Sequence, residues 1–242
     1  DLVFHLAAQA GVRYSFKNPK TYILNNINGF YNVIFLAKDY SVRHFIFASS
    51  SSVYGNNHAG KLNENLSTDQ HESLYAVTKS TNELIAKNFS NNYNLKSTAL
   101  RFFTVYGPYG RPDMGIYNFV DAIYKRKKIS LYNKGNNFRD FTYIDDVITL
   151  VEKLVFNSRN NKKYDVFNIG YGSQTKTRDL IKIIENELNL KAKIQLLESQ
   201  KGDVLKTHSD NKKIVKLTKF KPKNNITLGI KKFINWYLNY EK

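Results

Sequence analysis

The chain has 242 residues, of which 42% are hydrophobic and 14% aromatic, and this is enough to bury a full core. Intrinsic disorder is therefore excluded as its main state. The absence of cysteine excludes disulfides and thiolate metal sites, and we expect no metal. No apolar run approaches the roughly 18 residues of a membrane-spanning helix, and no signal-peptide pattern opens the chain, so we expect a cytoplasmic protein without membrane insertion.

The formal net charge of +17 is the strongest compositional bias. A basic field attracts polyanions, and nucleic acid is the first partner to consider. The lysines are spread along the chain, as in NNKKYD and DNKKIV, instead of gathering on one helix or arm. We therefore expect no nucleic acid partner, because an anionic small substrate would benefit from the same field.

Apolar runs rich in β-branched and aromatic residues alternate with amphipathic segments of helix length. This pattern predicts an α/β fold, with a parallel sheet and crossover helices. We expect strands at residues 2–7, 44–49, 98–103 and 166–169. We expect helices from about 21 to 39 and from about 73 to 92.

The sequence texture changes after Gly107, where the loop YGPYGRPDMG leads into a helix near 117–126 and the short strand ISLYN. A further helix begins behind residues 143–146. From about residue 177 the pattern predicts a helix, a strand and a closing amphipathic helix, IKKFINWYLNY. We expect a cofactor domain at 1–107, rejoined by 137–172, and a smaller substrate lobe made of 108–136 and 173–242.

A dinucleotide fold normally begins with a strand, a glycine-rich turn and a helix whose N-terminus holds the pyrophosphate. This chain carries no such element, since Gly107 and Gly110 sit beside prolines and open no helix at the right spacing. The motifs below favour a dinucleotide enzyme. We therefore expect the glycine-rich segment to lie upstream of Asp1 and the chain alone to be inactive.

Tyr75 and Lys79 form a Y-x-x-x-K pair on a predicted helix, a spacing that places both side chains on one face. Tyrosine is a poor base at neutral pH unless a nearby cation stabilises its phenolate, which a lysine four residues on can supply. A surface helix could show the same pair by chance. The segment ASSSSVYG, 48–55, makes chance less credible, because it brings Ser50 out of a buried strand where α/β sites form. Ser50 could hydrogen-bond the oxygen being oxidised and relay its proton to Tyr75.

Five segments in order carry a resemblance to a known family: HLAAQAGVRYS, ASSSSVYG, LYAVTKSTNEL, LRFFTVYGPYGRPDM and RDFTYIDD. They resemble the extended short-chain dehydrogenase/reductase family of NAD-dependent epimerases and dehydratases, and within it the UDP-glucuronate 4-epimerases. The resemblance implies a Rossmann-like, doubly wound sheet with a C-terminal substrate-binding lobe. It also implies NAD as cofactor, a UDP-sugar substrate and a homodimer formed through a helix bundle that includes the Tyr75 helix.

The resemblance also implies roles for individual residues. Ser50, Tyr75 and Lys79 would be the catalytic set. The cofactor would be lined by Leu6, Ala7, Ala8, Gln9, Asn25 and Phe103, together with Tyr75 and Lys79. The substrate would be bound by Ser51, Ser52, Thr104, Arg111, Arg139 and Asp140, with Arg139 and Asp140 facing the nucleotide and ISLYN running beside the uracil.

The expected reaction is epimerisation at carbon 4 of UDP-glucuronate to UDP-galacturonate through a 4-keto sugar, for surface or capsular polysaccharide synthesis. A 4,6-dehydratase would need an acid and a base where this chain has Ser51 and Ser52, so dehydration is disfavoured. A galactose-type 4-epimerase and a UDP-glucuronate decarboxylase stay open. A non-catalytic binding protein would be expected to have lost Tyr75 or Lys79.

Overall fold

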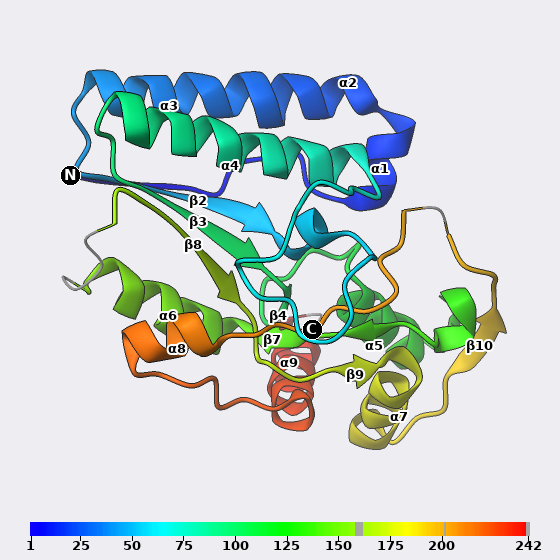
Figure 1. The fold of residues 1–242 in the computed structure, drawn as a ribbon. Coiled ribbons are helices and arrows are strands. Elements are labelled where there is room, and N and C mark those ends of the chain that lie inside the picture. Colours follow the sequence, from blue (N-terminus) through cyan, green and yellow to red (C-terminus); the bar gives the residue numbers. More distant parts are fainter. Residues whose placement is uncertain (158–161, 201, 241–242) are drawn as a thin grey trace.

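A four-stranded parallel sheet forms the centre of the computed structural model, which describes residues 1–157, 162–200 and 202–240 (Figure 1). Its strands lie in the order β1, β2, β3, β8, with bounds Leu2–His5, His44–Ser50, Ser97–Phe102 and Tyr164–Ile169. Every neighbouring pair is parallel, so the carboxyl ends of the strands meet at one edge. This confirms the expected α/β fold and puts the chain's candidate site at that edge.

Helices cover both faces of this sheet (Figure 1). One face carries α2 (Pro19–Tyr22), a π-helix (Ile23–Asn28), α3 (Gly29–Asp39) and α4 (Leu74–Asn92), and the other carries α6 (Ile144–Val155) and α8 (Lys212–Thr218). Successive residues of β2 serve the two faces, because Phe45 and Phe47 pack against α3 and α4 while Ile46 packs against α6 and α8. A strand buried on both faces explains the continuous apolar run in the sequence.

The helix expected at 21–39 is present but is interrupted by one π-helical turn at Ile23–Asn28. A π turn takes in more residues than an α turn and rotates the side chains that follow. The turn directs Asn26 inward, where it is 1% exposed, and leaves Asn25 on the surface.

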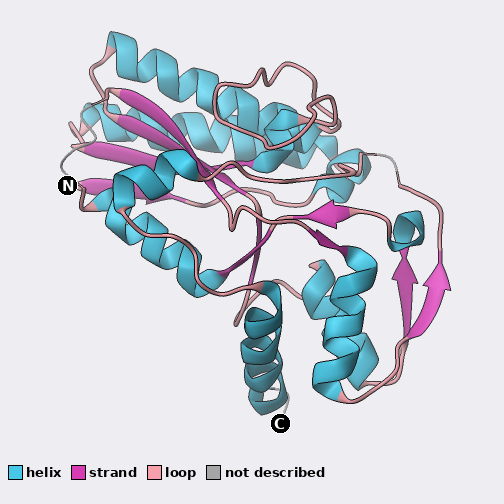
Figure 2. Cartoon of the chain, turned by 60° about the horizontal axis from the view of Figure 1, so that its bottom comes forward, coloured by secondary structure: helices cyan, strands magenta, loops and turns pink. Residues whose placement is uncertain are grey.

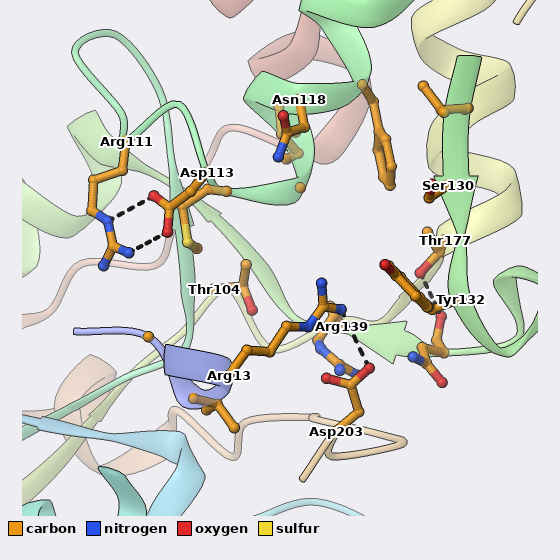
Figure 3. A pocket seen from close by; sticks show the side chains of 18 of the residues that line it. Arg13, Thr104, Arg111, Asp113, Asn118, Ser130, Tyr132, Arg139, Thr177 and Asp203 are labelled. Carbon is orange, nitrogen blue, oxygen red and sulfur yellow. Dashed lines mark hydrogen bonds and ion pairs between the residues drawn. The ribbon is translucent and has the colours of Figure 1, made fainter. Parts of the chain in front are cut away.

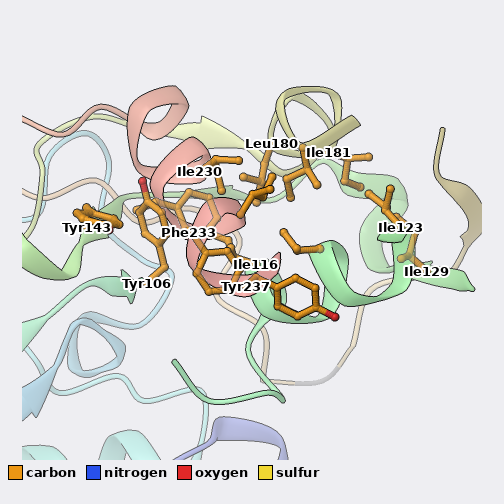
Figure 4. Close-up of a cluster of buried hydrophobic side chains, with 14 of the residues drawn as sticks. Tyr106, Ile116, Ile123, Ile129, Tyr143, Leu180, Ile181, Ile230, Phe233 and Tyr237 are labelled. Carbon is orange, nitrogen blue, oxygen red and sulfur yellow. The ribbon is translucent and has the colours of Figure 1, made fainter. Parts of the chain in front are cut away.

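The smaller lobe is built around three helices, α5 (Gly115–Tyr124), α7 (Thr177–Leu188) and α9 (Ile226–Tyr240), whose apolar sides meet in one core (Figure 4). Figure 2 shows this lobe below and to the right of the sheet. Its strands pair two by two: β5 (Lys128–Leu131) with β10 (Lys193–Leu196), β4 (Thr104–Tyr106) with β7 (Phe141–Tyr143), and β6 (Phe138–Arg139) with β9 (Thr175–Lys176). The short helices are α1 (Val12–Lys17) and two 3-10 segments, Ser51–Tyr54 and Tyr132–Gly135.

The two lobes interleave in the sequence more than we expected. Residues 212–218 were assigned to the substrate lobe, but α8 packs against the sheet through Ile214, beside α6. α9 stays with the small lobe. Gly229 of α9 allows its close approach to β4, because a β-carbon there would lie 1.9 Å from the Tyr106 hydroxyl.

No helix among the described residues is both long and apolar enough to cross a membrane.

Candidate active site

The expected catalytic residues come together at the carboxyl edge of the sheet. Ser50 is the last residue of β2 and is 8% exposed. Its hydroxyl caps the following 3-10 helix, Ser51–Tyr54, by accepting the Ser52 N–H at 3.1 Å. Tyr75 lies in the first turn of α4, which Ser73 caps by accepting the Ala76 N–H at 3.2 Å. The loop between β2 and α4 thus brings a strand end and a helix start to the same place.

Burial raises the pKa of Tyr75, while a hydrogen bond with Ser50 and the positive charge of Arg111 act in the opposite direction. The Ser50 contact is the one that the proton relay requires. The sequence predicted that Arg111 binds the substrate. Its effect on the pKa of Tyr75 was not predicted.

Lys79 is 4% exposed, one turn further along α4. Its Nζ donates to the carbonyl oxygen of Ala48 at 2.8 Å, and burial lowers its pKa to about 8. Lys79 therefore remains mostly a cation at neutral pH, and its charge also helps to lower the pKa of His5. This places a positive charge beneath the end of β2, where a cofactor's nicotinamide half would lie.

A buried polar network supports α4 behind the catalytic residues. Glu83 forms a bidentate ion pair with Arg101 of β3, with Nε to Oε1 at 2.9 Å and Nη2 to Oε2 at 2.7 Å. Glu83 Oε1 also accepts the Ser49 hydroxyl at 2.5 Å, and the Arg101 guanidinium lies 4.7 Å from the ring centroid of Tyr54. Tyr75, Lys79 and Glu83 follow one another at intervals of four residues and therefore share one face of the helix. This spacing is the feature of the sequence that indicates Glu83.

Asn25 lies on the surface and bonds its own helix, which does not support its assignment to the cofactor. Asn25 is exposed and its amide donates to Thr21 O at 3.0 Å on its own helix. Asn26 instead accepts the Gln9 N–H at 2.7 Å and donates to Gln9 O at 3.0 Å and to Thr78 at 3.1 Å. Asn26 thereby fixes the segment that follows β1 against α4.

The residues expected to line a dinucleotide occupy an open edge. β1 ends at His5, and Leu6 and Ala7 beyond it are exposed, with Leu6 at 52%. Ala8 and Gln9 continue toward the cavity described below. These residues, with Ser50, Tyr75 and Lys79, fit the reactive half of a nicotinamide cofactor. The described residues include no glycine-rich turn that would hold the pyrophosphate, and no group of three metal-ligating side chains.

A cavity of about 1080 Å³ extends from this edge into the small lobe (Figure 3). Gln9, Gly11 and Thr104 line it at the sheet side, and β5 and the turn at Tyr132 line it at the far side. Its charged lining residues are five cations and two acids, namely Arg13, Lys17, Arg111, Lys128, Arg139, Asp113 and Asp203. This net positive lining suits an elongated anionic ligand.

Arg111 and Asp113 form a bidentate pair at the catalytic end, with Nε to Oδ1 at 2.9 Å and a second bond between Nη2 and Oδ2 (Figure 3). The Arg111 side chain is 45% exposed, and its Nη2 lies 3.6 Å from the point where a Gly11 side chain would begin. A guanidinium that already holds one carboxylate bidentately has the geometry to hold another. Arg111 and Thr104 both line the cavity, and their binding of the substrate stays a prediction.

At the far end, two more arginines surround Asp203. Arg13 of α1 lies 3.5 Å from Asp203 and 4.6 Å from the ring centroid of Tyr132, so it joins the sheet side to the small lobe across the cavity. Arg139 donates to the carbonyl oxygens of Phe138 at 2.9 Å and Leu205 at 3.2 Å, and burial lowers its pKa. Arg139 lines the cavity, and its contact with the nucleotide stays a prediction, whereas Arg13 was not singled out from the sequence.

Asp140 does not face the cavity, which corrects its assignment to the nucleotide. It is 0% exposed, and its carboxylate accepts the N–H groups of Tyr171, Gly172 and Ser209 at 2.9, 2.9 and 3.0 Å. The Ser209 hydroxyl adds a bond of 2.7 Å. Burial raises the pKa of Asp140 and these donors oppose the rise. Asp140 therefore ties three chain segments together and has little capacity left for a ligand.

Phe103 is packed in the interior, and its expected contact with the cofactor stays a prediction. It is 5% exposed and lies in a small apolar cluster with Val53, Tyr54 and Leu62. Ser51 is buried, and Ser52 accepts the Ser50 hydroxyl at 3.1 Å. Neither serine is among the described residues that line the cavity, so their role toward the substrate stays a prediction.

Comparison with known proteins gives one consistent result. A model of the NAD dependent epimerase/dehydratase family matches residues 1–170. The chain is 42% identical to Protein CapI of Staphylococcus aureus, over all of this chain and 77% of that protein. It is also 42% identical to UDP-glucuronate 4-epimerase 4 of Arabidopsis thaliana, over 98% of this chain and 58% of that protein. Among solved structures, UDP-glucuronic acid 4-epimerase from Bacillus cereus in complex with UDP-glucuronic acid and NAD superimposes with a TM-score of 0.95 at 32% identity, over 99% of this chain and 76% of that one.

Proposed function

This chain belongs to the NAD-dependent epimerase/dehydratase family, and we propose that it interconverts UDP-glucuronate and UDP-galacturonate by oxidation and re-reduction at carbon 4. The observation that carries the proposal is that Tyr75 hydrogen-bonds Ser50 and is influenced by the charge of Arg111, which lines the cationic cavity. The groups proposed to transfer the proton are thus linked to the arginine proposed to bind the sugar's carboxylate.

The chain's own residues handle the proton and the substrate. Tyr75, in hydrogen-bond contact with Ser50, accepts the proton of the sugar 4-hydroxyl and returns it after the ketone has turned over. Lys79 and Arg111 hold positive charge near that proton while it moves. NAD, when bound, supplies the acceptor and donor of the hydride at carbon 4. Arg13 and Arg139 at the far end would hold the UDP moiety while the sugar rotates.

Recognition of the carboxylate is the decisive specificity step. Oxidation of glucuronate at carbon 4 gives a β-keto acid, which loses carbon dioxide when the carboxylate rotates into overlap with the ketone. An epimerase must hold that carboxylate still. Arg111 and Thr104 line the cavity and have the donors to do so, and Ser51 and Ser52 are the further hydroxyls that we propose for this role.

Following both sugars by NMR in the NAD-loaded enzyme tests this proposal. We expect UDP-glucuronate and UDP-galacturonate to interconvert without net reduction of NAD, and UDP-glucose to react far more slowly. Arg111→Ala or Thr104→Ala should release some decarboxylated 4-keto pentose. Equal rates on UDP-glucose and UDP-glucuronate would contradict the carboxylate assignment, and a pentose as the main wild-type product would indicate a decarboxylase.

Two wider parts of the proposal concern the assembly and the use of the product. We infer a homodimer formed through the exposed side of α3 and α4, where Tyr31, Val77 and Leu84 are 46%, 40% and 67% exposed. The product, an acidic nucleotide sugar, would be consumed by glycosyl transfer into a surface or capsular polysaccharide.

A further inference from the structure

Tyr109 stands out at the tip of the loop that carries Arg111. Its backbone has a φ of 58°, a left-handed conformation that residues with bulky side chains rarely adopt. Its side chain is 82% exposed. We therefore expect a contact of the Tyr109 ring that offsets the cost of this backbone conformation.

That contact is with the last helix. The Tyr109 ring lies edge-on at 5.3 Å from the Trp236 centroid and 6.2 Å from the Tyr240 centroid. Trp236 and Tyr240 stack at 4.9 Å, and Trp236 lies 5.5 Å from Phe233, which is 1% exposed. Offset and edge-to-face pairs at such distances are favourable beyond the area they bury. A ladder of rings thus runs from the lobe core to the loop tip.

The loop itself is tightly constrained between this ladder and the site. Gly110 N donates to Gly107 O at 3.1 Å, which closes the turn that presents Tyr109. Two residues after Tyr109, Arg111 turns back toward Asp113, Gly11 and Tyr75. α9 contributes no residue to the described lining of the cavity, so it can act on the site only through its neighbours, and the loop is one of them.

We propose that Tyr109, Trp236 and Tyr240 form an aromatic clasp that positions the Arg111 loop, so that the last helix controls recognition of the sugar's carboxylate without touching it. The inference rests on the proposed function, since it assigns the clasp to the carboxylate-binding arginine. Tyr109 and Trp236 are positioning residues and act on the substrate through Arg111.

The clasp can be observed directly, because Trp236 is the only tryptophan of the chain. Tyr109→Ala should expose the indole and shift its fluorescence emission to the red. Tyr109→Phe keeps the ring and should leave the emission unchanged. Tyr124→Ala serves as the matched control, since Tyr124 is a half-exposed tyrosine of the same lobe that contacts Tyr237 and not Trp236. An emission spectrum that does not respond to Tyr109→Ala would overturn the clasp.

The positioning role is tested by calorimetric binding of UDP-glucuronate and UDP-glucose to the same variants. Tyr109→Ala and Trp236→Ala should weaken binding of the acid sugar by about tenfold, near 1.4 kcal/mol, and leave UDP-glucose binding within about twofold. Tyr109→Phe should restore the preference and Tyr124→Ala should retain it. If Tyr109→Ala weakens both sugars equally, or neither, the clasp does not position Arg111 and the inference fails.

A double variant separates this inference from the function on which it rests. In the Arg111→Ala background, Tyr109→Ala should cause no further loss for UDP-glucuronate, because both changes remove the same interaction. Additive losses would overturn the positioning role. Equal affinity of the wild type for the two sugars would contradict carboxylate recognition itself and remove the basis of both. If the wild type prefers UDP-glucuronate but the losses of Arg111→Ala and Tyr109→Ala are additive, only the clasp is overturned.

Discussion

Arg111 is placed for two functions that the sequence assigned to different residues, binding of a carboxylate and lowering of the pKa of Tyr75. Its guanidinium holds Asp113 bidentately, which shows that it can hold a carboxylate, and its charge lowers the pKa of Tyr75 against the effect of burial. From the sequence, Lys79 was the cation expected to assist Tyr75. In the structure Lys79 is engaged with the carbonyl oxygen of Ala48. The residue proposed to recognise the substrate therefore also lowers the pKa of the proposed base.

Replacement of Arg111 should shift the pH profile as well as the affinity. Tyr75 must lose its proton to act as a base, and the Arg111 charge lowers its pKa. Arg111→Ala removes that charge, so the pKa of Tyr75 rises and the acid limb of kcat/KM moves to higher pH. Arg111→Lys retains a charge and should shift the limb less. An unchanged limb in Arg111→Ala would show that its charge does not reach Tyr75.

Tyr75→Phe should abolish turnover and leave UDP-sugar binding nearly intact, because it removes the proton acceptor and little volume. The measurement is an assay of turnover, with UDP-sugar binding followed in parallel by calorimetry. Phe103→Leu, in the buried cluster behind the site, controls for loss of packing. If Tyr75→Phe retained more than about a tenth of the wild-type kcat, a loss below ~1.4 kcal/mol, another group would have to be the base.

At the scale of elements, Asp140 holds several chain segments together at the junction between the sheet and the small lobe. Its carboxylate accepts donors from 171–172 and from 209, while its own carbonyl accepts the Thr104 N–H at 3.0 Å. β4, β7 and the ends of β8 are thereby held around one buried group. The neighbouring Thr104 and Arg139 are cavity residues, so the position of the substrate depends on this junction.

Asp140→Ala should lower the free energy of unfolding by ~3 kcal/mol or more, because it leaves several buried N–H and O–H groups without an acceptor. Urea denaturation followed by circular dichroism measures this loss. Asp39→Ala, which removes a half-exposed carboxylate paired with Lys38 on the surface, should change stability by less than about 0.5 kcal/mol. A loss of similar size in the two variants would contradict the central role of Asp140.

The elements that local patterns determine were predicted well. The strands of the sheet, the Tyr75 helix and the meeting of Ser50 with Tyr75 follow from alternation, helix spacing and the shared edge of parallel strands. The surface position of Asn25 was not predicted, because a π turn changes the phase of a helix and a single sequence gives no sign of it. Asp140 was wrong because its partners at 171, 172 and 209 are distant in the chain. A sequence motif identifies Asp140 but not the distant residues that donate hydrogen bonds to it.

At the scale of the whole molecule, the helical face formed by α3 and α4 should mediate dimerisation. Exposed apolar side chains gather there, and a soluble surface rarely leaves such a band uncovered. Light scattering after size exclusion should give twice 28.1 kDa for the wild type and the single mass for Leu84→Glu. Leu228→Glu, at a similarly exposed leucine of α9, should remain dimeric. A monomeric wild type, or a dimeric Leu84→Glu, would exclude this face.

The contact of Arg13 with Asp203 joins residues that are 190 positions apart. On a ribosome that adds about 5–20 residues per second, Asp203 is therefore made roughly 10–40 s after Arg13. β8 also joins the sheet only after the β5–β7 region of the small lobe has been synthesised. Between the synthesis of β3 and that of β8, the nascent chain has the β3 edge of the sheet uncovered. We expect chaperones that shield apolar surface to bind during this interval, and binding of the proposed nucleotide sugar to begin only after Asp203 has been made.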